Sequence, residues 1–339
     1  TIRDQSSVRR LRLLDAVESQ MFYAEANECE SWIKEKRPIL TSTDYGKDED
    51  QVQSLQKKLE ALQRELIAFE PSVDKVTKLA ENLLERGHFD SDKIRSKSEK
   101  IQQQLNDLKQ FSVEREKRLE VQRKFLEFMR EVEDLHEWIG DQMTVASSEE
   151  YGTDVEHVEL LIIAFDSFVS NMTANEPRIY QCIAKGDELI KEENPQSKII
   201  QKKRDETKQL WDELKDLLTA RQDALTGAKQ VHVYDRTSDE TISWINEKIG
   251  DLLSEDFGQD LETIQALIRK HEGFETEVAV LREQVAQVQS EATKLADAFP
   301  DARDHIEVKK EEAVESWTEL TEKSELRKGK LAQAEQLQA

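Results

Sequence analysis

The sequence repeats itself every 106 residues, and this period restricts the possible folds more than any other feature. Two series of large apolar residues keep the interval: Trp32, Trp138 and Trp244 in one, and Leu105, Trp211 and Trp317 in the other. Because a shared period across the chain is the signature of tandem structural units, three copies of one unit are predicted.

A short motif with Gly and Asp recurs at the same interval. It is DYGKD at residues 44–48, EYGTD at 150–154 and DFGQD at 256–260. Gly accepts the left-handed backbone conformation that ends helices, and Asp can accept hydrogen bonds from the free amides of the next helix. The motif therefore predicts a break between two helices. The predicted break and cap residues are Gly46, Asp48, Gly152, Asp154, Gly258 and Asp260.

Apolar residues before each motif follow helical spacing. In the first copy they begin at Phe22 and recur at spacings of 4, 3 and 4, and the corresponding stripes begin at Phe128 and Tyr234. The third copy puts Ser238 and Thr241 on the stripe, so we expect its first helix to be less tightly packed. The predicted core residues are Trp32, Trp138, Trp244, Trp211, Trp317, Leu105, Phe22, Phe128 and Tyr234.

A second set of helix breakers divides the rest of each copy into two helices. These breakers are at residues 87–88, 194–195 and 299–300. The predicted fold is all-α, with tandem three-helix left-handed coiled-coil bundles joined by continuous helices into a rod. The expected boundaries are 1–13 for the end of a preceding helix, then 14–119, 120–225 and 226–339 for the three repeats.

The junctions between copies decide whether the bundles form one stiff unit. Residues 89–139 contain no Gly or Pro, so one helix is predicted to run from the first copy into the second. In that junction we expect Leu119 to pack and Arg115 to be solvated or paired with a carboxylate. At the second junction Gly227 is the predicted hinge, because Gly weakens a helix by about 1 kcal/mol. Pro71 and Pro177 predict kinks in two second helices.

Composition excludes several classes of partner. The net charge is −23, which repels nucleic acid and anionic lipid. The apolar runs, such as residues 160–165, are too short for a membrane span. Two Cys do not make a disulfide framework, and the composition suits the reducing cytosol.

Motifs that would carry catalysis or bind a metal are missing from the sequence. There is no HExxH and no Cys/His pair with zinc spacing, and the histidines are interpreted as exposed helix and loop residues. Cys29 occupies a stripe position, so a small core residue is expected rather than a nucleophile. Residues 44–50 are acidic but lack the order of a calcium loop. We therefore predict no enzyme activity, cofactor or metal.

The repeat motifs resemble those of spectrin. The segments ESWI, HEWI and ISWI around the first Trp series match the first-helix signature of that family, as do STDYGKDED (residues 42–50) and SEDFGQDLETIQALIRKHEGFE (residues 254–275). The resemblance covers nearly the whole chain. Residues 130–161 resemble a β or β-heavy chain, while other segments resemble α-chain repeats equally, and the β class is preferred.

The resemblance implies a role in the cytoskeleton at the inner face of the plasma membrane. Spectrins cross-link actin, and their repeats act as spacers, springs and docking sites. The implied partner is a complementary spectrin chain in antiparallel pairing. The alternative function is docking of ankyrin or another adaptor protein, suggested by departures from the repeat such as the stretch SNMTANEPRI (residues 170–179).

Overall fold

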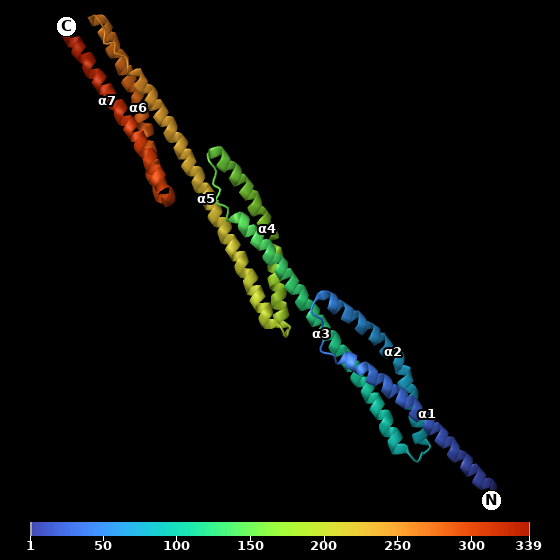
Figure 1. The fold of residues 1–339 in the computed structure, drawn as a ribbon. Coiled ribbons are helices and arrows are strands. Elements are labelled where there is room, and N and C mark those ends of the chain that lie inside the picture. Colours follow the sequence, from blue (N-terminus) through green and yellow to red (C-terminus); the bar gives the residue numbers. More distant parts are fainter. Residues whose placement is uncertain (1, 339) are drawn as a thin grey trace. The chain divides into compact units, whose positions relative to one another are not determined.

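The computed structural model describes residues 2–338, which form seven long α-helices and one short 3-10 helix, η1 (Figure 1). The helices are α1 (Ile2–Leu40), α2 (Glu49–Glu85), α3 (Ser91–Ala146), α4 (Val155–Lys191), α5 (Ser197–Asp251), α6 (Leu261–Ala298) and α7 (Arg303–Gln338), with η1 at Pro300–Ala302. No strand occurs in this part of the chain. The prediction of an all-α fold is confirmed.

The chain divides into two compact units. One comprises residues 2–138 and 178–210, and the other comprises residues 139–177 and 211–338. The division cuts through the helices α3, α4 and α5, each of which contributes a segment to both units.

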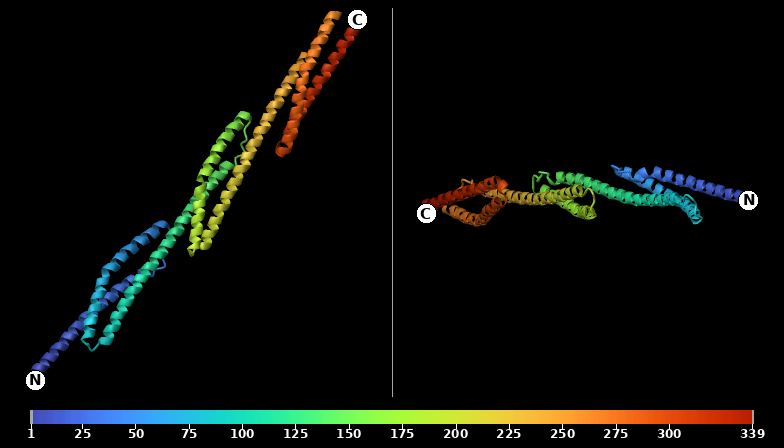
Figure 2. Two further views of the ribbon diagram at one scale, coloured as in Figure 1. Left: turned by 180° about the vertical axis from the view of Figure 1, so that it is seen from behind. Right: turned by 90° about the horizontal axis from the view of Figure 1, so that it is seen from below.

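The first unit contains a complete three-helix bundle made by α1, α2 and the first half of α3 (Figures 1 and 2). Its core is one continuous cluster of aliphatic residues with Cys29 and the fully buried Phe22. Trp32 lies at the edge of this core and stacks on Phe69, with ring centroids 3.9 Å apart. The same unit holds a second group of buried residues on α3, α4 and α5, where Phe128 lies against Gly186.

The second unit ends in another complete bundle, made by the second half of α5 with α6 and α7. Its core consists of two separate clusters, one around Tyr234 and one around Ile245. Ser238 and Thr241 lie between these two residues on α5 and are both buried. The core of this bundle is therefore interrupted at the polar positions that the sequence places on the stripe.

Aspartates begin the second helix of each copy. The Asp48 carboxylate accepts a hydrogen bond from the Gln51 amide, Asp154 from that of His157 and Asp260 from that of Thr263, each at 2.8 Å. These bonds satisfy amides that have no partner within the helix.

The predicted breaks between the first and second helices are present, but the motif glycines lie within these loops and not at the ends of the preceding helices. α1 already ends at Leu40, whereas Gly46 lies two residues before Asp48, the cap of α2. Gly46, Gly152 and Gly258 have φ values of 87°, 80° and 86°. A Cβ on Gly152 would lie 2.7 Å from the Val158 side chain. These glycines therefore shape the approach to the second helix, where the loop folds back on its first turn.

The predicted core residues differ in their burial. Most are fully or nearly buried: Phe22, Phe128, Tyr234, Trp211 and Leu105. Three others are half-buried: Trp32, Trp138 and Trp317. Trp244 is 45% exposed, so the prediction that it belongs to the core is wrong.

The exposure of Trp244 has a local cause. It precedes Ile245, which occupies the stripe and is fully buried, so Trp244 lies about 100° around the helix from the centre of the core. Trp32 has the same register but is covered by Phe69. The position in α6 that corresponds to Phe69 is Leu281, which packs in the core cluster of Ile245.

Candidate functional site: the helical junctions

The first junction is formed by an unbroken helix. α3 extends over 56 residues and contains both the third helix of the first copy and the first helix of the second. The prediction of a continuous helix is confirmed. The sequence permits it because residues 91–139 include no helix breaker and provide strong helix formers such as Glu, Lys, Leu and Gln.

Arg115 of α3 anchors the loop between α1 and α2. Its guanidinium donates hydrogen bonds to the carbonyl oxygens of Ser42, at 2.5 Å, and Asp44, at 2.9 Å. It also lies over the Tyr45 ring, 5.6 Å from the centroid. The side chain is buried, so the expectation of a solvated or carboxylate-paired arginine is wrong. The fixed fork of the guanidinium can bind two carbonyls at once.

The same anchor occurs in the other copies. Arg221 donates to the Glu150 carbonyl at 3.1 Å and lies over Tyr151. Arg327 donates to the Asp256 carbonyl at 3.3 Å and lies over Phe257. In each copy, the recurring arginine thus contacts the recurring aromatic residue of the loop. The leucines four residues after these arginines, Leu119, Leu225 and Leu331, are buried, whereas Leu13 is 60% exposed.

Gln122 joins two loops at the first junction. Its Nε2 donates to the Gly46 carbonyl at 3.1 Å, and its Oε1 accepts from Gln196 at 3.3 Å. Gly46 belongs to the first loop of the first copy, and Gln196 belongs to the second loop of the second copy. One side chain on the continuous helix therefore connects neighbouring copies. No sequence pattern indicated this contact, because Gln is common on helix surfaces and its partners lie 74 and 76 residues away.

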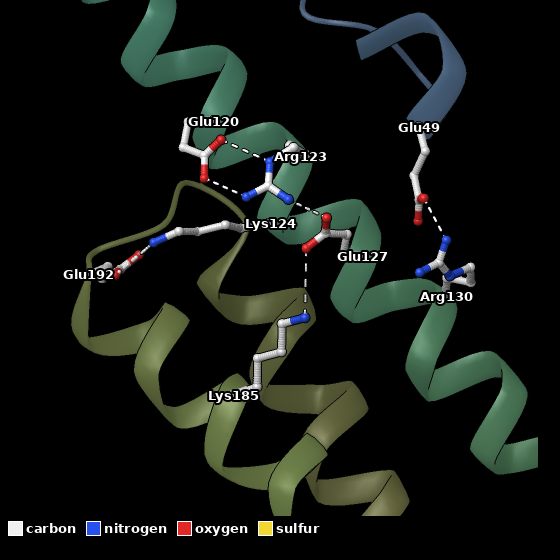
Figure 3. A network of polar contacts seen from close by, with 8 residues as sticks. All are labelled: Glu49, Glu120, Arg123, Lys124, Glu127, Arg130, Lys185 and Glu192. Carbon is white, nitrogen blue, oxygen red and sulfur yellow. Dashed lines mark hydrogen bonds and ion pairs between the residues drawn. The ribbon is translucent and has the colours of Figure 1, made fainter. Parts of the chain in front are cut away.

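Ion pairs lie along the same part of α3 (Figure 3). Three of them connect α3 to other helices or loops: Arg130 to Glu49 at 2.6 Å, Lys124 to Glu192 at 2.9 Å, and Lys185 to Glu127 at 3.8 Å. Arg123 connects Glu120 and Glu127 along α3 itself. The contacts tie α3 both to α2 of the first copy and to α4 of the second.

The charges of this network shift one another's pKa. The hydrogen bond to Arg123 lowers the pKa of Glu120, and the hydrogen bond to Glu192 raises that of Lys124. The side chains of these pairs are partly exposed, and solvent screening limits pairs of this kind to about 0–1 kcal/mol each. The network therefore fixes the register of the loops on α3 more than it adds stability.

The second junction has a different chemistry. α5 runs unbroken from Ser197 to Asp251 and includes Gly227. A Cβ at Gly227 would lie only 2.6 Å from Cε1 of Phe299, so the aromatic ring occupies the space beside the glycine. The close approach of the Phe299 ring to α5 explains why residue 227 is a glycine, and the sequence did not reveal this contact. The hinge at this residue stays a prediction.

Two ion pairs join α5 to α4 at the second junction. Lys229 pairs with Glu159 at 2.9 Å, and Arg236 pairs with Glu156 at 2.5 Å. The position that corresponds to Gln122 is Ala228, which has no side-chain amide to join two loops. An unbroken helix thus runs through both junctions, but the side chains around it differ.

The thiols are buried within the bundles. Cys29 and Cys182 are both 3% exposed. Burial raises the pKa of both, that of Cys182 to about 11, so the reactive thiolate is disfavoured.

Two histidines are buried, contrary to the expectation that all six are exposed. His88 and His271 are 7% and 6% exposed. His271 occupies a core position where the first two copies have Leu59 and Phe165, and burial lowers its pKa. In residues 2–338 no three His, Cys, Asp or Glu side chains are placed to hold a metal ion. None of the described helices is long and apolar enough to span a bilayer.

Together, the tandem bundles, shared helices and anchored loops define a class of helical repeat proteins. The spectrin repeat model matches residues 17–121, 123–227 and 229–333. The chain belongs to the spectrin repeat family.

Curated relatives are similar over nearly the whole chain. The spectrin beta chain of Drosophila melanogaster is 29% identical over 98% of this chain, and the erythrocytic spectrin beta chain of Mus musculus is 30% identical over 94%. The mouse erythrocytic spectrin alpha chain 1 is 26% identical over 94%. These similarities agree with the preference for the β class. This chain spans only 14%, 15% and 13% of the three relatives' lengths.

Proposed function

We propose that this chain is a structural spacer segment of a spectrin-based membrane skeleton at the inner face of the plasma membrane. Its role there is to give length and elasticity, and no catalytic step is involved. Membership of the spectrin repeat family supports the structural role. Pairing with a complementary spectrin chain, in antiparallel orientation, belongs to the same proposal and is supported by the similarity to both β and α chains.

The observation that carries the proposal is the first junction. A spacer transmits force only if neighbouring bundles are mechanically coupled. The 56-residue α3 would provide this coupling through its backbone. Gln122 adds side-chain contacts to loops of both copies, and Arg130 adds an ion pair to the start of α2. Bundles connected in this way are expected to unfold cooperatively.

A proline substitution tests the coupling. Glu120→Pro should break α3 at the junction, since proline in a helix interior costs about 3 kcal/mol or more. Differential scanning calorimetry should then show separate transitions for the first copy and the rest of the chain. A matched control is Glu283→Pro in α6, because the corresponding residues of α2 and α4 are Pro71 and Pro177.

The control variant should lose less stability than Glu120→Pro and should keep the unfolding pattern of the parent. If Glu120→Pro also keeps that pattern, the junction does not couple the bundles, and the spacer role loses its main support.

The alternative role is docking of an ankyrin-type adaptor, motivated by the departures from the repeat in residues 170–179. A pull-down with an ankyrin fragment addresses it directly. Absence of binding at tens of micromolar would remove this alternative and leave the spacer role untouched.

A further inference from the structure

The middle of α4 is almost free of charge. Residues 160–175 contain one charged residue, Asp166, whereas the corresponding windows of α2 (54–69) and α6 (266–281) contain five each. Charged residues make up 36% of the whole chain, so the depletion is local. A solvated helix face normally carries charged or polar groups, and this window departs from that pattern.

Only one side of this window is covered by the bundle. Val158, Phe165 and Met172 are buried and recur at intervals of seven. The opposite side is exposed and is here called the α4 outer face: Leu160, Ile163, Ser167, Ser170 and Ala174. These residues follow each other at spacings of 3, 4, 3 and 4, which is the spacing of a helix–helix contact.

The first two residues of the α4 outer face have large aliphatic side chains. Leu160 is 67% exposed and Ile163 is 64% exposed. The corresponding residues are Ser54 and Lys57 in α2, and Ala266 and Arg269 in α6. The exposure is therefore particular to this helix and does not follow from the repeat.

The hydroxyl groups on and beside this face donate their hydrogen bonds to backbone carbonyls of α4 itself. Ser167 donates to the Ile163 carbonyl at 3.0 Å, Ser170 to the Asp166 carbonyl at 2.8 Å and Thr173 to the Val169 carbonyl at 3.0 Å. Because the helix itself satisfies these donors, an apolar partner could cover them without leaving a hydroxyl proton unpaired. The small side chains also permit close approach of a second helix.

We propose that the α4 outer face docks one amphipathic helix of another protein. That helix would carry bulky apolar residues at heptad spacing and one Lys or Arg opposite Asp166. Apolar burial along Leu160 and Ile163 provides the attraction, and the cation sets the register against the single carboxylate.

Charge complementarity selects this occupant. The Asp166 carboxylate is exposed and has no ion-pair partner in residues 2–338. Glu156 and Glu159, at the start of the same helix, already pair with Arg236 and Lys229. A second copy of this chain also has a net charge of −23, so the two copies would repel each other. The same negative charge would repel an anionic lipid surface.

The test uses the 339-residue chain and a synthetic helix as probe. The probe is a labelled peptide of about 24 residues, long enough to form a helix, with Leu at heptad spacing, one central Lys at the edge of the Leu face and Gln elsewhere. Fluorescence anisotropy should show saturable binding. The double variant Leu160→Ser with Ile163→Lys, which installs the residues of α2, should weaken binding by about tenfold or more.

Two controls separate the site from general stickiness. Ile67→Lys removes an equally exposed aliphatic residue of α2 and should leave binding unchanged. Asp166→Lys should weaken binding of the Lys probe and restore binding of a probe with Glu at the same place. Circular dichroism should show all variants equally helical, since the changes lie on exposed positions.

The proposal is overturned if the Lys probe shows no saturable binding, or if the double variant and Ile67→Lys lower the affinity equally. It is also overturned if the parent chain dimerises in sedimentation experiments and the double variant does not, because the occupant is then a second copy. Equal binding of neutral lipid vesicles in place of the probe would contradict it as well.

Discussion

The recurring arginine shows how one side chain can organise a loop. Arg115 combines two carbonyl hydrogen bonds with a contact to the Tyr45 ring. Arg221 and Arg327 likewise donate to a loop carbonyl and lie over a loop aromatic ring. Its period was visible in the sequence, but its partners were not, since they lie about 70 residues away and two of them are backbone atoms. An internal repeat reveals residue types that recur at a fixed spacing. Any residue type can supply a backbone carbonyl, so the sequence does not show which residue accepts the hydrogen bond.

The burial of each tryptophan predicts how much stability the protein loses when that residue is replaced by alanine. Trp211 is 3% exposed and Trp244 is 45% exposed. Trp211→Ala should lower the free energy of unfolding by about 3–5 kcal/mol, as for other buried large aromatics. Trp244→Ala should cost about 1 kcal/mol or less, since it removes little buried area. Urea denaturation of both variants measures the difference, and equal losses would show that the assigned burial is wrong.

His271 predicts a pH dependence of the third bundle. Burial lowers its pKa from the ordinary value of 6.5, and Arg327 and Lys328 of α7 act in the same direction, while Glu275 of α6 opposes them. The unfolded state therefore binds the proton more readily than the folded state. Stability is fully present above the unfolded value and falls as the pH decreases below about 6.5.

His271→Leu, which installs the residue found at Leu59 in the first copy, should reduce this loss. Urea denaturation at about pH 8 and about pH 5 gives the change for each protein, and the comparison cancels the titration of the carboxylates that both share. If the variant and the parent lose the same stability on acidification, His271 does not titrate between the folded and unfolded states.

At the scale of the helices, the sequence predicted the architecture well. Helix number, order and the continuity of α3 follow from apolar spacing, breakers and their absence, which are local properties of the chain. The difference between the two junctions was only partly visible. Gly227 suggested weakness, but the ring of Phe299 beside it comes from a distant loop, and a local rule cannot anticipate such a contact.

Gly227→Ala distinguishes a flexible glycine from a packed one. Helix propensity alone would stabilise α5 by about 1 kcal/mol. The new Cβ, however, would lie 2.6 Å from Phe299 and should displace the ring, so we expect a net loss of about 1 kcal/mol within the range for overpacking. Phe299→Ala in the same chain should remove the penalty of the Ala substitution. Chemical denaturation of the double-mutant cycle checks the sign, and a stabilised single variant would support the hinge instead.

At the scale of the whole molecule, the proposed mechanical coupling depends on the two helices that neighbouring copies share. Each shared helix belongs to two copies, so we expect the unfolding of one copy to disturb its neighbour. The copies also differ in ways that repetition does not require, such as Gln122 against Ala228 and the uncharged α4 outer face. Such differences are where specific roles of individual repeats are expected.

Small-angle X-ray scattering of the isolated chain tests the central claim, that continuous helices make the bundles one spacer. Helices of about 30 to 38 residues make each bundle about 45–57 Å long, so three bundles in line predict an elongated particle with a maximum dimension of about 150 Å. A much shorter or folded particle would show that the chain bends back at a junction, with Gly227 the first place to examine, and would contradict the spacer role.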